Sequence, residues 1–516
     1  MDNEVKEPNG PLRARTRVTM EHLWALAVIA CIWAYVATHP IRPHDFWWHL
    51  EVGREIVATH QIPQVDAFSY TVPGAPYPSY NVYWLADTLL YLVYAAGGPA
   101  LSVFAHSLLI VLTYGLVLWR CGRLSGSGRV AALCAVAAAA CGFENWNLRP
   151  QAITFLLATV YLVLIYWLRS RGADRPGRRG PEKRVRDGRA HAVPAAVLTF
   201  PLLMVVWVNC HGSFPLGIVL LGMWLVETLV EDRRRAWVPL VALGLSAAAM
   251  LLNPQGLGIF GYLAAMAGNP VVQRLPEWAP ASLATKDGAV FFVLLGLSVI
   301  VLALAWRRVR LFHVLSFVFF ALLAWKTGRA IVWFGLAVAP VLAETLPALL
   351  PQARAAERAD RAEAIINSVF AAGLLALMVV TLPWLKDRLP LSPQKAGLVS
   401  SETPLAATDY LMAHHLPPPV FASMSYGSYL IWAAQPTYKM FADPRIELYP
   451  QSVWDDYHAV SDARPDWQDI LDRYEVQTLM VEVREQPRLV AAAEGSPQWR
   501  QVYEDARTVM LVRRAR

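Results

Sequence analysis

The chain has 516 residues, of which 56% are hydrophobic and 16% are charged, whereas soluble domains carry roughly 25% charged residues. Its mean hydropathy is +0.36, and its apolar runs of about 18 to 20 residues are long enough to cross a bilayer as helices. These values exclude an ordinary soluble protein. The net charge of +7 comes largely from arginine clusters between apolar runs, so it indicates membrane topology and not nucleic-acid binding.

Eleven stretches of the chain are candidate membrane spans. They lie near residues 22–38, 101–119, 130–143, 151–168, 193–208, 213–230, 236–252, 288–306, 309–325, 329–348 and 366–386. A twelfth stretch, 83–97, is short and contains Asp87. We interpret it as an interfacial or re-entrant helix.

The basic loops set the expected orientation, because loops rich in Lys and Arg stay in the cytoplasm. These loops are 120–129, 169–189, 231–235, 307–310 and 354–361. All five loops fall on one side of the membrane if 83–97 does not cross it. If 83–97 crossed the membrane with no compensating further span, the loop 169–189 would lie outside. We therefore predict a multi-pass protein of a bacterial-type plasma membrane, with residues 1–21 in the cytoplasm and the C-terminus outside.

Two larger units follow from this topology. Residues 22–386 form the α-helical membrane domain, in which 39–100 is a large first outer loop. Residues 387–516 are polar and form a small α/β domain on the extracytoplasmic side. The segments that indicate its helices and strands are 453–462 and 467–475 for helices, and 476–483 and 507–514 for strands.

Polar motifs collect at the expected outer ends of the spans. They are 44–53, 63–71, 144–151, 209–214, 253–256, 274–278 and 326–329. Ionisable groups at membrane depth usually mark a functional site. We therefore expect a shared outer cavity.

The segment 42–56, "RPHDFWWHLEVGREI", is the most informative of these motifs. Asp45 and His49 are four residues apart, so they share one face of a helix, and Gly53 would allow a helix or substrate to approach that face. A carboxylate in a low-dielectric rim is suited to act as a general base. The alternative is an interfacial anchor helix, because Trp47 and Trp48 suit the headgroup region.

Further candidates each have a plain structural alternative. Asp66 follows Pro63 and is either a catalytic acid or a turn residue; Glu277 is an active-site acid or a loop acid. Asp87 is more readily a polar residue that faces the core. Glu51 and Glu55 fit a solvated helix surface.

Three cations and a histidine are candidates for binding an anionic head group. Arg149, Lys326 and Arg329 lie at outer ends, where the positive-inside rule disfavours them, and arginine matches phosphate oxygens. The alternative is contact with ordinary lipid phosphates. His211 is a phosphate donor or a satisfied core histidine.

These residues resemble a known family. The sequence contains neither GxxxxGK[ST] nor a GxGxxG motif after a strand, which leaves an activated lipid as the natural donor for chemistry at the outer face. An acid directly after the first span, in a large outer loop, resembles the GT-C superfamily of integral-membrane glycosyltransferases. Residues 45–74 are similar to the first outer loop of oligosaccharyltransferase catalytic subunits, and Asp45 matches their catalytic acid. The pattern D-x-W-W-H-x-x-x-G also resembles the D-E-x-H-x-G signature of protein mannosyltransferases, with Phe46 in place of the Glu.

A second likeness lies near the C-terminus. Residues 424–445 resemble the oligosaccharyltransferase segment around W-W-D-Y-G, but here residues 423–427 read S-M-S-Y-G. The two tryptophans and the aspartate that recognise a sequon are absent. N-glycosylation of sequons is therefore not expected, and a different acceptor is.

The resemblance implies transfer of a sugar from a polyprenyl-phosphate or polyprenyl-diphosphate carrier to an unknown glycan, lipid or protein acceptor, with inversion. It implies a base, Asp45. Asp66 is the second candidate catalytic residue, from its place in the first outer loop. No cofactor is expected to be required, although Mg²⁺ or Mn²⁺ would be bound if Asp45, Asp66 and an acid such as Glu277 converged. The residues expected to bind substrate are His49, Arg149, His211, Glu277, Lys326 and Arg329.

Two other functions stay open at this point. A transporter or flippase of a lipid-linked sugar would show polar span centres or an inverted repeat. A non-catalytic membrane scaffold would bind a partner through residues 387–516.

Overall fold

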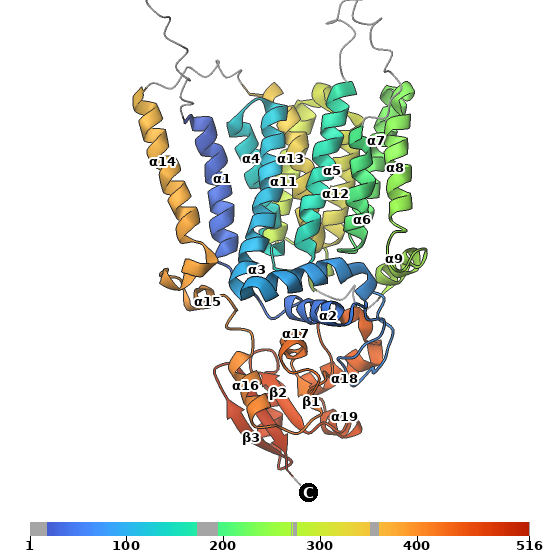
Figure 1. The fold of residues 1–516 in the computed structure, drawn as a ribbon, viewed down its shortest axis with the longest axis vertical. Helices are drawn as coiled ribbons and strands as arrows, with labels where there is room; N and C mark the ends of the chain where they lie inside the picture. The colour runs from blue at the N-terminus through green and yellow to red at the C-terminus, as the bar shows by residue number, and fades with distance from the viewer. Residues whose placement is uncertain (1–17, 173–194, 270, 272–275, 351–360, 515–516) are drawn as a thin grey trace, which may run out of the picture.

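The computed structural model describes residues 18–172, 195–269, 271, 276–350 and 361–514. Along its long axis the molecule has a helix bundle, a layer of crossing helices beneath it, and the C-terminal domain below that layer (Figure 1). Most of two basic loops used for the orientation, 173–189 and 354–360, lies outside the described residues.

The bundle is built from apolar helices that stand side by side. They are α1 (Met20–Ala37), the second arm of α3 (Tyr80–Ser125), α4 (Gly128–Gly142), α5 (Gln151–Gly172), α6 (Thr199–Val208), α7 (Pro215–Glu231), α8 (Trp237–Ala249), α11 (Lys286–Leu304), α12 (Leu311–Lys326), α13 (Ile331–Thr345) and α14 (Arg361–Val380). Among the described residues, six helices are long and apolar enough to cross a membrane. This confirms a multi-pass helical protein, while the count of eleven spans stays a prediction.

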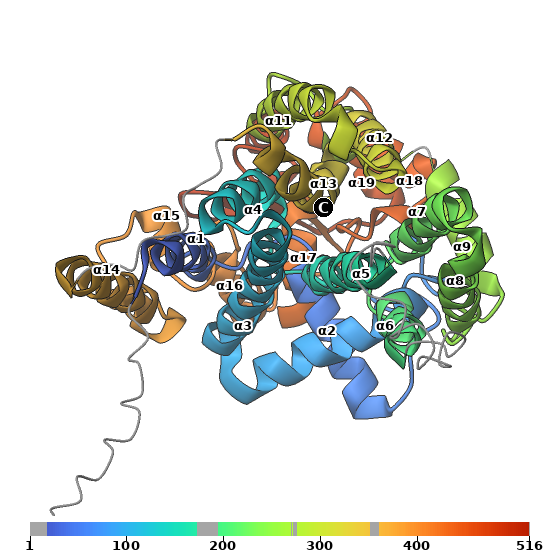
Figure 2. The same ribbon diagram turned by 90° about the horizontal axis from the view of Figure 1, so that it is seen from above.

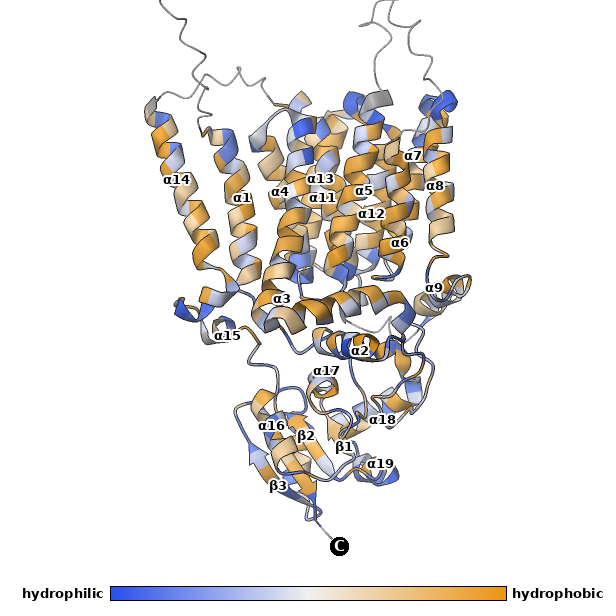
Figure 3. Cartoon of the chain, in the orientation of Figure 1, coloured by the Kyte–Doolittle hydropathy of each residue, from blue (hydrophilic) through white to orange (hydrophobic). Residues whose placement is uncertain are grey.

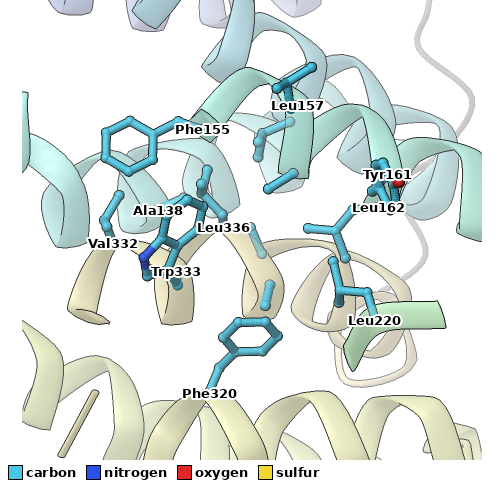
Figure 4. Close-up of a cluster of buried hydrophobic side chains, with 14 of the residues drawn as sticks. Ala138, Phe155, Leu157, Tyr161, Leu162, Leu220, Phe320, Val332, Trp333 and Leu336 are labelled. Atoms are coloured by element: carbon cyan, nitrogen blue, oxygen red, sulfur yellow. The ribbon is translucent and has the colours of Figure 1, made fainter. Parts of the chain in front are cut away.

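The helix α13 lies at the centre of the bundle. Every residue from Ile331 to Ala343 is buried, which is typical of a helix that is apolar on all sides. Its Trp333 packs edge-on against Phe155 of α5, with ring centroids 5.1 Å apart, in the cluster shown in Figure 4. In contrast, α14 stands at the rim beside α1 (Figure 2).

The bundle is apolar along its length, and hydrophilic residues gather at the end opposite the C-terminal domain (Figure 3). The short basic helices η4 (Arg233–Arg235) and η6 (Trp306–Arg308) belong to the connections α7–α8 and α11–α12. Such a distribution matches the charge pattern from which the cytoplasmic end was predicted.

The helix α3 changes direction in its middle. Gly97 and Gly98 leave the helical conformation, Gly98 with φ at +60°, and Pro99 follows. Because glycine adopts positive φ without strain, the kink falls there. The first arm lies across the lower ends of the bundle and the second arm stands inside it (Figure 1), which agrees with an interfacial helix at 83–97.

The helix α2 (Phe46–Thr59) packs beneath this first arm. The two helices meet at Gly53, where an added methyl group would overlap the backbone carbonyl of Asp87. The close approach expected at Gly53 is thus made by a helix. The short helix α9 (Gly258–Gly268) lies at the same level of the molecule.

The C-terminal domain contains a four-stranded sheet in the order β1-β2-β4-β3, in which β1 is parallel to β2 and the other pairs are antiparallel. Its strands and helices are β1 (Val420–Ala422), β2 (Thr478–Glu482), β3 (Trp499–Glu504), β4 (Thr508–Arg513), α15 (Pro393–Ala396), α16 (Leu405–Ala413), α17 (Met424–Ala433), α18 (Gln451–Ser461), α19 (Trp467–Arg473) and α20 (Pro487–Glu494). The two predicted helices and two predicted strands are confirmed, whereas β1 and β3 were not predicted.

The first outer loop and the C-terminal domain share one hydrophobic core. Trp48, Phe68 and Tyr80 belong to the same buried cluster as the residues of β1, β2 and β4. Backbone bridges join Ile41 to Val399 and Ser69 to Met440. The two segments therefore behave as a single packed unit beneath the bundle.

Candidate active site

A cavity of about 600 Å³ lies between the lower end of the bundle and the C-terminal domain, within the usual size range of ligand sites. Side chains from the first loop, from the segments before α5 and after α6, and from α17 line it. Six of the eight predicted site residues are among them: Asp45, His49, Arg149, His211, Glu277 and Arg329.

Four of these residues form a chain of alternating charge. The Nη1 of Arg149 lies 3.3 Å from Asp45 Oδ2 and 3.4 Å from Glu277 Oε2. Arg329 Nη1 lies 2.7 Å from Glu277 Oε1. The residues come from the start of α2, the loop before α5, the short helix η5 (Pro276–Trp278) and the short helix η7 (Gly328–Ala330). The fold thus brings four distant segments to one point.

The carboxylate of Glu277 is held in its charged form by this arrangement. Burial raises its pKa, but the adjacent Arg329 and Arg149 guanidinium groups lower it by more, so the pKa lies below the ordinary glutamate value. Glu277 therefore stays ionised at neutral pH and links the two arginines.

The two predicted histidines are both buried at the cavity wall. His49 Nδ1 lies 2.7 Å from Asp87 Oδ1, and His211 Nδ1 lies 3.0 Å from Ser213 Oγ. Burial lowers the pKa of each imidazole well below its ordinary value, and the nearby Arg149 lowers both further. Both rings are thus neutral at neutral pH.

No family model and no curated protein matches this sequence. Solved structures do match. Over 90% of this chain and 70% of the other, an oligosaccharyltransferase from Archaeoglobus fulgidus aligns with a TM-score of 0.53 at 12% identity. ArnT from Cupriavidus metallidurans, bound to undecaprenyl phosphate, aligns over 94% and 97% with a TM-score of 0.51 at 15% identity. The arabinofuranosyltransferase AftD from Mycobacteria aligns over 97% of this chain and 40% of its own, with a TM-score of 0.56 at 14% identity.

The chain has a GT-C-like fold. At these identities the likeness establishes the fold, and the residues of this chain must support any activity.

Two predicted site residues lie outside the cavity of this GT-C-like fold. Asp66 is buried in the C-terminal core, where Arg445 Nη1 donates to its Oδ1 at 2.5 Å. Lys326 is exposed at the end of α12. Asp66 therefore does not line the cavity in which it was expected. It pairs instead with Arg445, which is so distant in the sequence that no local pattern connects the two.

The ligand set considered for a divalent metal is not assembled. Asp66 lies apart from Asp45 and Glu277, and a guanidinium group lies between the latter two. Within the described ranges, no group of three His, Cys, Asp or Glu side chains is arranged to hold a metal. The residues present at this point do not fit a divalent ion.

The GT-C-like fold also brings residues to the cavity that sequence reasoning missed. Arg42 and His44 belong to the segment 42–56, whose local concentration of charged and aromatic residues is the signal that could identify them. Ser425 and Glu447 come from the C-terminal domain, and Glu447 Oε1 accepts hydrogen bonds from Tyr77 and Ser79 at 2.8 and 2.9 Å. No local pattern places these residues about 380 to 400 positions away beside Asp45.

Proposed function

We propose that this chain is a GT-C-type glycosyltransferase. It transfers a sugar from a polyprenyl-phosphate-type lipid to an acceptor hydroxyl at the outer face of a bacterial-type plasma membrane, with inversion. The observation that carries this proposal is the chain of charges from Asp45 through Arg149 and Glu277 to Arg329 on one cavity. The fold shared with ArnT, whose structure contains undecaprenyl phosphate, supports it.

Asp45 is the proposed general base. Its side chain is 26% exposed at the cavity, so one part is shielded and another part is reachable by a substrate. In the proposed step a carboxylate oxygen of Asp45 takes the acceptor proton as the acceptor oxygen attacks the anomeric carbon. The bond from that carbon to the phosphate oxygen breaks, and the electron pair leaves with the polyprenyl phosphate.

The two arginines are the proposed binding groups for the phosphate. Their side chains are 12% and 23% exposed, and shielding from water strengthens the attraction between charges. The leaving phosphate gains negative charge as the bond breaks, so fixed guanidinium groups stabilise the transition state more than the ground state. Glu277 acts through the arginines and is a positioning residue.

The position of the cavity suits a lipid-linked substrate. It lies at the lower end of the bundle, where the apolar helices meet the polar C-terminal domain. A polyprenyl tail would remain among lipids while its head group reached the arginines. The acceptor, whether glycan, lipid or protein, would approach along α17, which contributes Ser425.

The proposal is tested with the full chain in nanodiscs, radiolabelled hexosyl and pentosyl polyprenyl phosphates, and bacterial membranes as the acceptor source. Label that enters lipid, glycan or protein fractions reports transfer. We expect Asp45→Asn to lower transfer by at least about 10³-fold, because proton abstraction and charge are both lost. Glu55→Gln is the matched control, since Glu55 lies on α2 but does not line the cavity.

Binding of undecaprenyl phosphate distinguishes a variant that has lost catalysis from one that has failed to fold. Asp45→Asn should still bind undecaprenyl phosphate, whereas Arg329→Met should bind it at least about tenfold more weakly. Transfer by Asp45→Asn at the wild-type rate would refute the assignment of the base. Movement of labelled donor across the bilayer without transfer would instead favour the flippase alternative.

A further inference from the structure

We infer that His49 and Asp87 form a pair that presents one imidazole nitrogen to the cavity as a hydrogen-bond acceptor for a sugar hydroxyl. This inference rests on the proposed glycosyltransferase function. It adds Asp87 to the site as a residue that acts through His49, and it identifies the group that His49 recognises.

The pair is short and shielded from water. The distance from His49 Nδ1 to Asp87 Oδ1 is 2.7 Å, and the two residues are 4% and 0% exposed. Asp87 Oδ2 has no hydrogen-bond partner within the described residues, so the imidazole is the group that this carboxylate holds. Burial raises the pKa of the Asp87 carboxyl well above its ordinary value, so in the proposed pair a carboxyl proton belongs on the unpartnered Oδ2. Oδ1 then accepts a hydrogen bond from the imidazole Nδ1, and Nε2 carries no proton.

Packing fixes the plane of the ring. Trp48 stacks on His49 with centroids 3.5 Å apart, and Tyr83 meets it edge-on at 5.2 Å. Gly53 allows the backbone of α2 to approach the carbonyl of Asp87, so the two helices set the distance between the paired side chains. A site held by packed helices in this way is preorganised for its ligand.

The second nitrogen, Nε2, is the one available to a ligand. His49 lines the cavity one helical turn after Asp45, and within the described ranges Nε2 makes no hydrogen bond. Arg149 and Arg329 can only donate hydrogen bonds, so they suit phosphate oxygens and cannot accept a proton from a hydroxyl. A neutral Nε2 beside them supplies the acceptor that a sugar hydroxyl needs.

The state of the ring depends on its charged and titratable neighbours. They are Asp45 on the same helix, Asp87 and Tyr83 on α3, Arg149 before α5 and His211 after α6. Burial and the nearby Arg149 favour the neutral imidazole. A second proton would convert Nε2 into a donor, so recognition of the hydroxyl should fail as the pH falls.

Three variants test this role in the transfer assay, with the donor that the wild type uses. His49→Phe keeps an aromatic ring without an acceptor and should lower kcat/KM by about 10- to 100-fold. His49→Gln offers a carbonyl oxygen that does not titrate; it should stay within about tenfold of the wild type and show a shallower acidic limb of the pH profile, in which only the requirement for an unprotonated general base remains. Asp87→Asn lets the amide donate to Nδ1, moves the proton to Nε2 and should match His49→Phe.

The double variant decides whether Asp87 acts through His49. We expect Asp87→Asn to have no further effect on kcat/KM in the His49→Gln background, because coupled residues are not additive. Equal losses in both backgrounds would overturn the pairing. Wild-type kcat/KM in His49→Phe, or an unchanged acidic limb in His49→Gln, would overturn the acceptor role.

These failures are distinct from failure of the proposed function. An inactive Asp45→Asn with a fully active His49→Phe would remove only the pair from the mechanism. An active Asp45→Asn would remove the assigned base. Undecaprenyl phosphate binding by each variant reports correct folding, and the pH profile of His49→Gln remains a valid readout if His49→Phe does not fold.

Discussion

Substitution of Asp66 distinguishes a structural role from a catalytic one. The carboxylate accepts hydrogen bonds from Arg445 Nη1 at 2.5 Å, from the Phe68 and Ser69 amides at 3.2 and 3.0 Å, and from the Ser69 hydroxyl at 2.5 Å. Asp66→Ala leaves these buried donors without an acceptor. Asp443 still pairs with Arg445 at 2.6 Å, so the cation is only partly uncompensated.

The expected cost follows from these contacts. Removal of one partner from a buried ion pair costs about 3–5 kcal/mol, and Asp66→Asn, which keeps an acceptor oxygen, should cost about 1–3 kcal/mol. For a domain of this size we expect Asp66→Ala to lower the midpoint of thermal unfolding by roughly 10 °C. Asp469→Ala, an exposed acid in α19, should change stability by less than about 0.5 kcal/mol.

The assay heats the purified protein and measures the monodisperse fraction by size-exclusion chromatography, with transfer activity measured on the fraction that remains. We expect activity per folded molecule to survive in Asp66→Asn. A variant with wild-type thermal stability and no transfer would refute this reasoning and return Asp66 to the catalytic site.

Three further predictions concern other parts of the molecule. Gly53→Ala should cost about 1–3 kcal/mol and reduce transfer, because a methyl group overlaps the Asp87 carbonyl, whereas Gly296→Ala, where the added methyl meets open space, should do neither. Glu277→Gln should lower transfer about tenfold by releasing both arginines. It should also make the thermal midpoint less sensitive to acid. The lowered pKa of Glu277 stabilises the wild-type fold above the ordinary value of 4.5, and this stabilisation is lost as the pH falls below 4.5. The glutamine cannot titrate, so the variant lacks that loss. Burial lowers the pKa of Lys386 from 10.5 to about 8, so the folded state disfavours its charged form; the thermal midpoint of Lys386→Met relative to the wild type should be highest at pH 7 and should decline between pH 8 and 10.5.

Much of the architecture was predictable because bilayers impose simple rules. The lengths of the apolar runs and the arginine-rich loops predicted the multi-pass bundle. They also predicted that Asp45, Arg149 and Arg329 lie at the same end of it, the end that faces the C-terminal domain. The strand-like stretches 476–483 and 507–514 predicted β2 and β4; β2 is buried throughout, and β4 is buried along its first four residues. The strand β3 escaped prediction because much of it is exposed, and β1 has only three residues.

The pairings within the site could not be predicted. Asp87 was interpreted as a core-facing residue, and it does face the core, but its partner is His49 on another helix. Asp66 and Lys326 share the local features of true cavity residues, namely a charge near a span end. What separates them is a long-range partner, Arg445, and the direction in which α12 presents its last turn, neither of which leaves a local pattern.

The joint core of the first loop and the C-terminal domain has a consequence for biosynthesis. Asp66 and Arg445 lie 379 positions apart, and chains grow at about 5–20 residues per second. In the proposed orientation, the first loop reaches the outer face roughly 20 to 75 s before the segment that buries it has been synthesised. During that interval its apolar side chains, Phe68 and Tyr80 among them, are open to chaperones and proteases outside the membrane. The order of translation thus makes residues 387–516 the part of the chain that completes and covers the proposed active site.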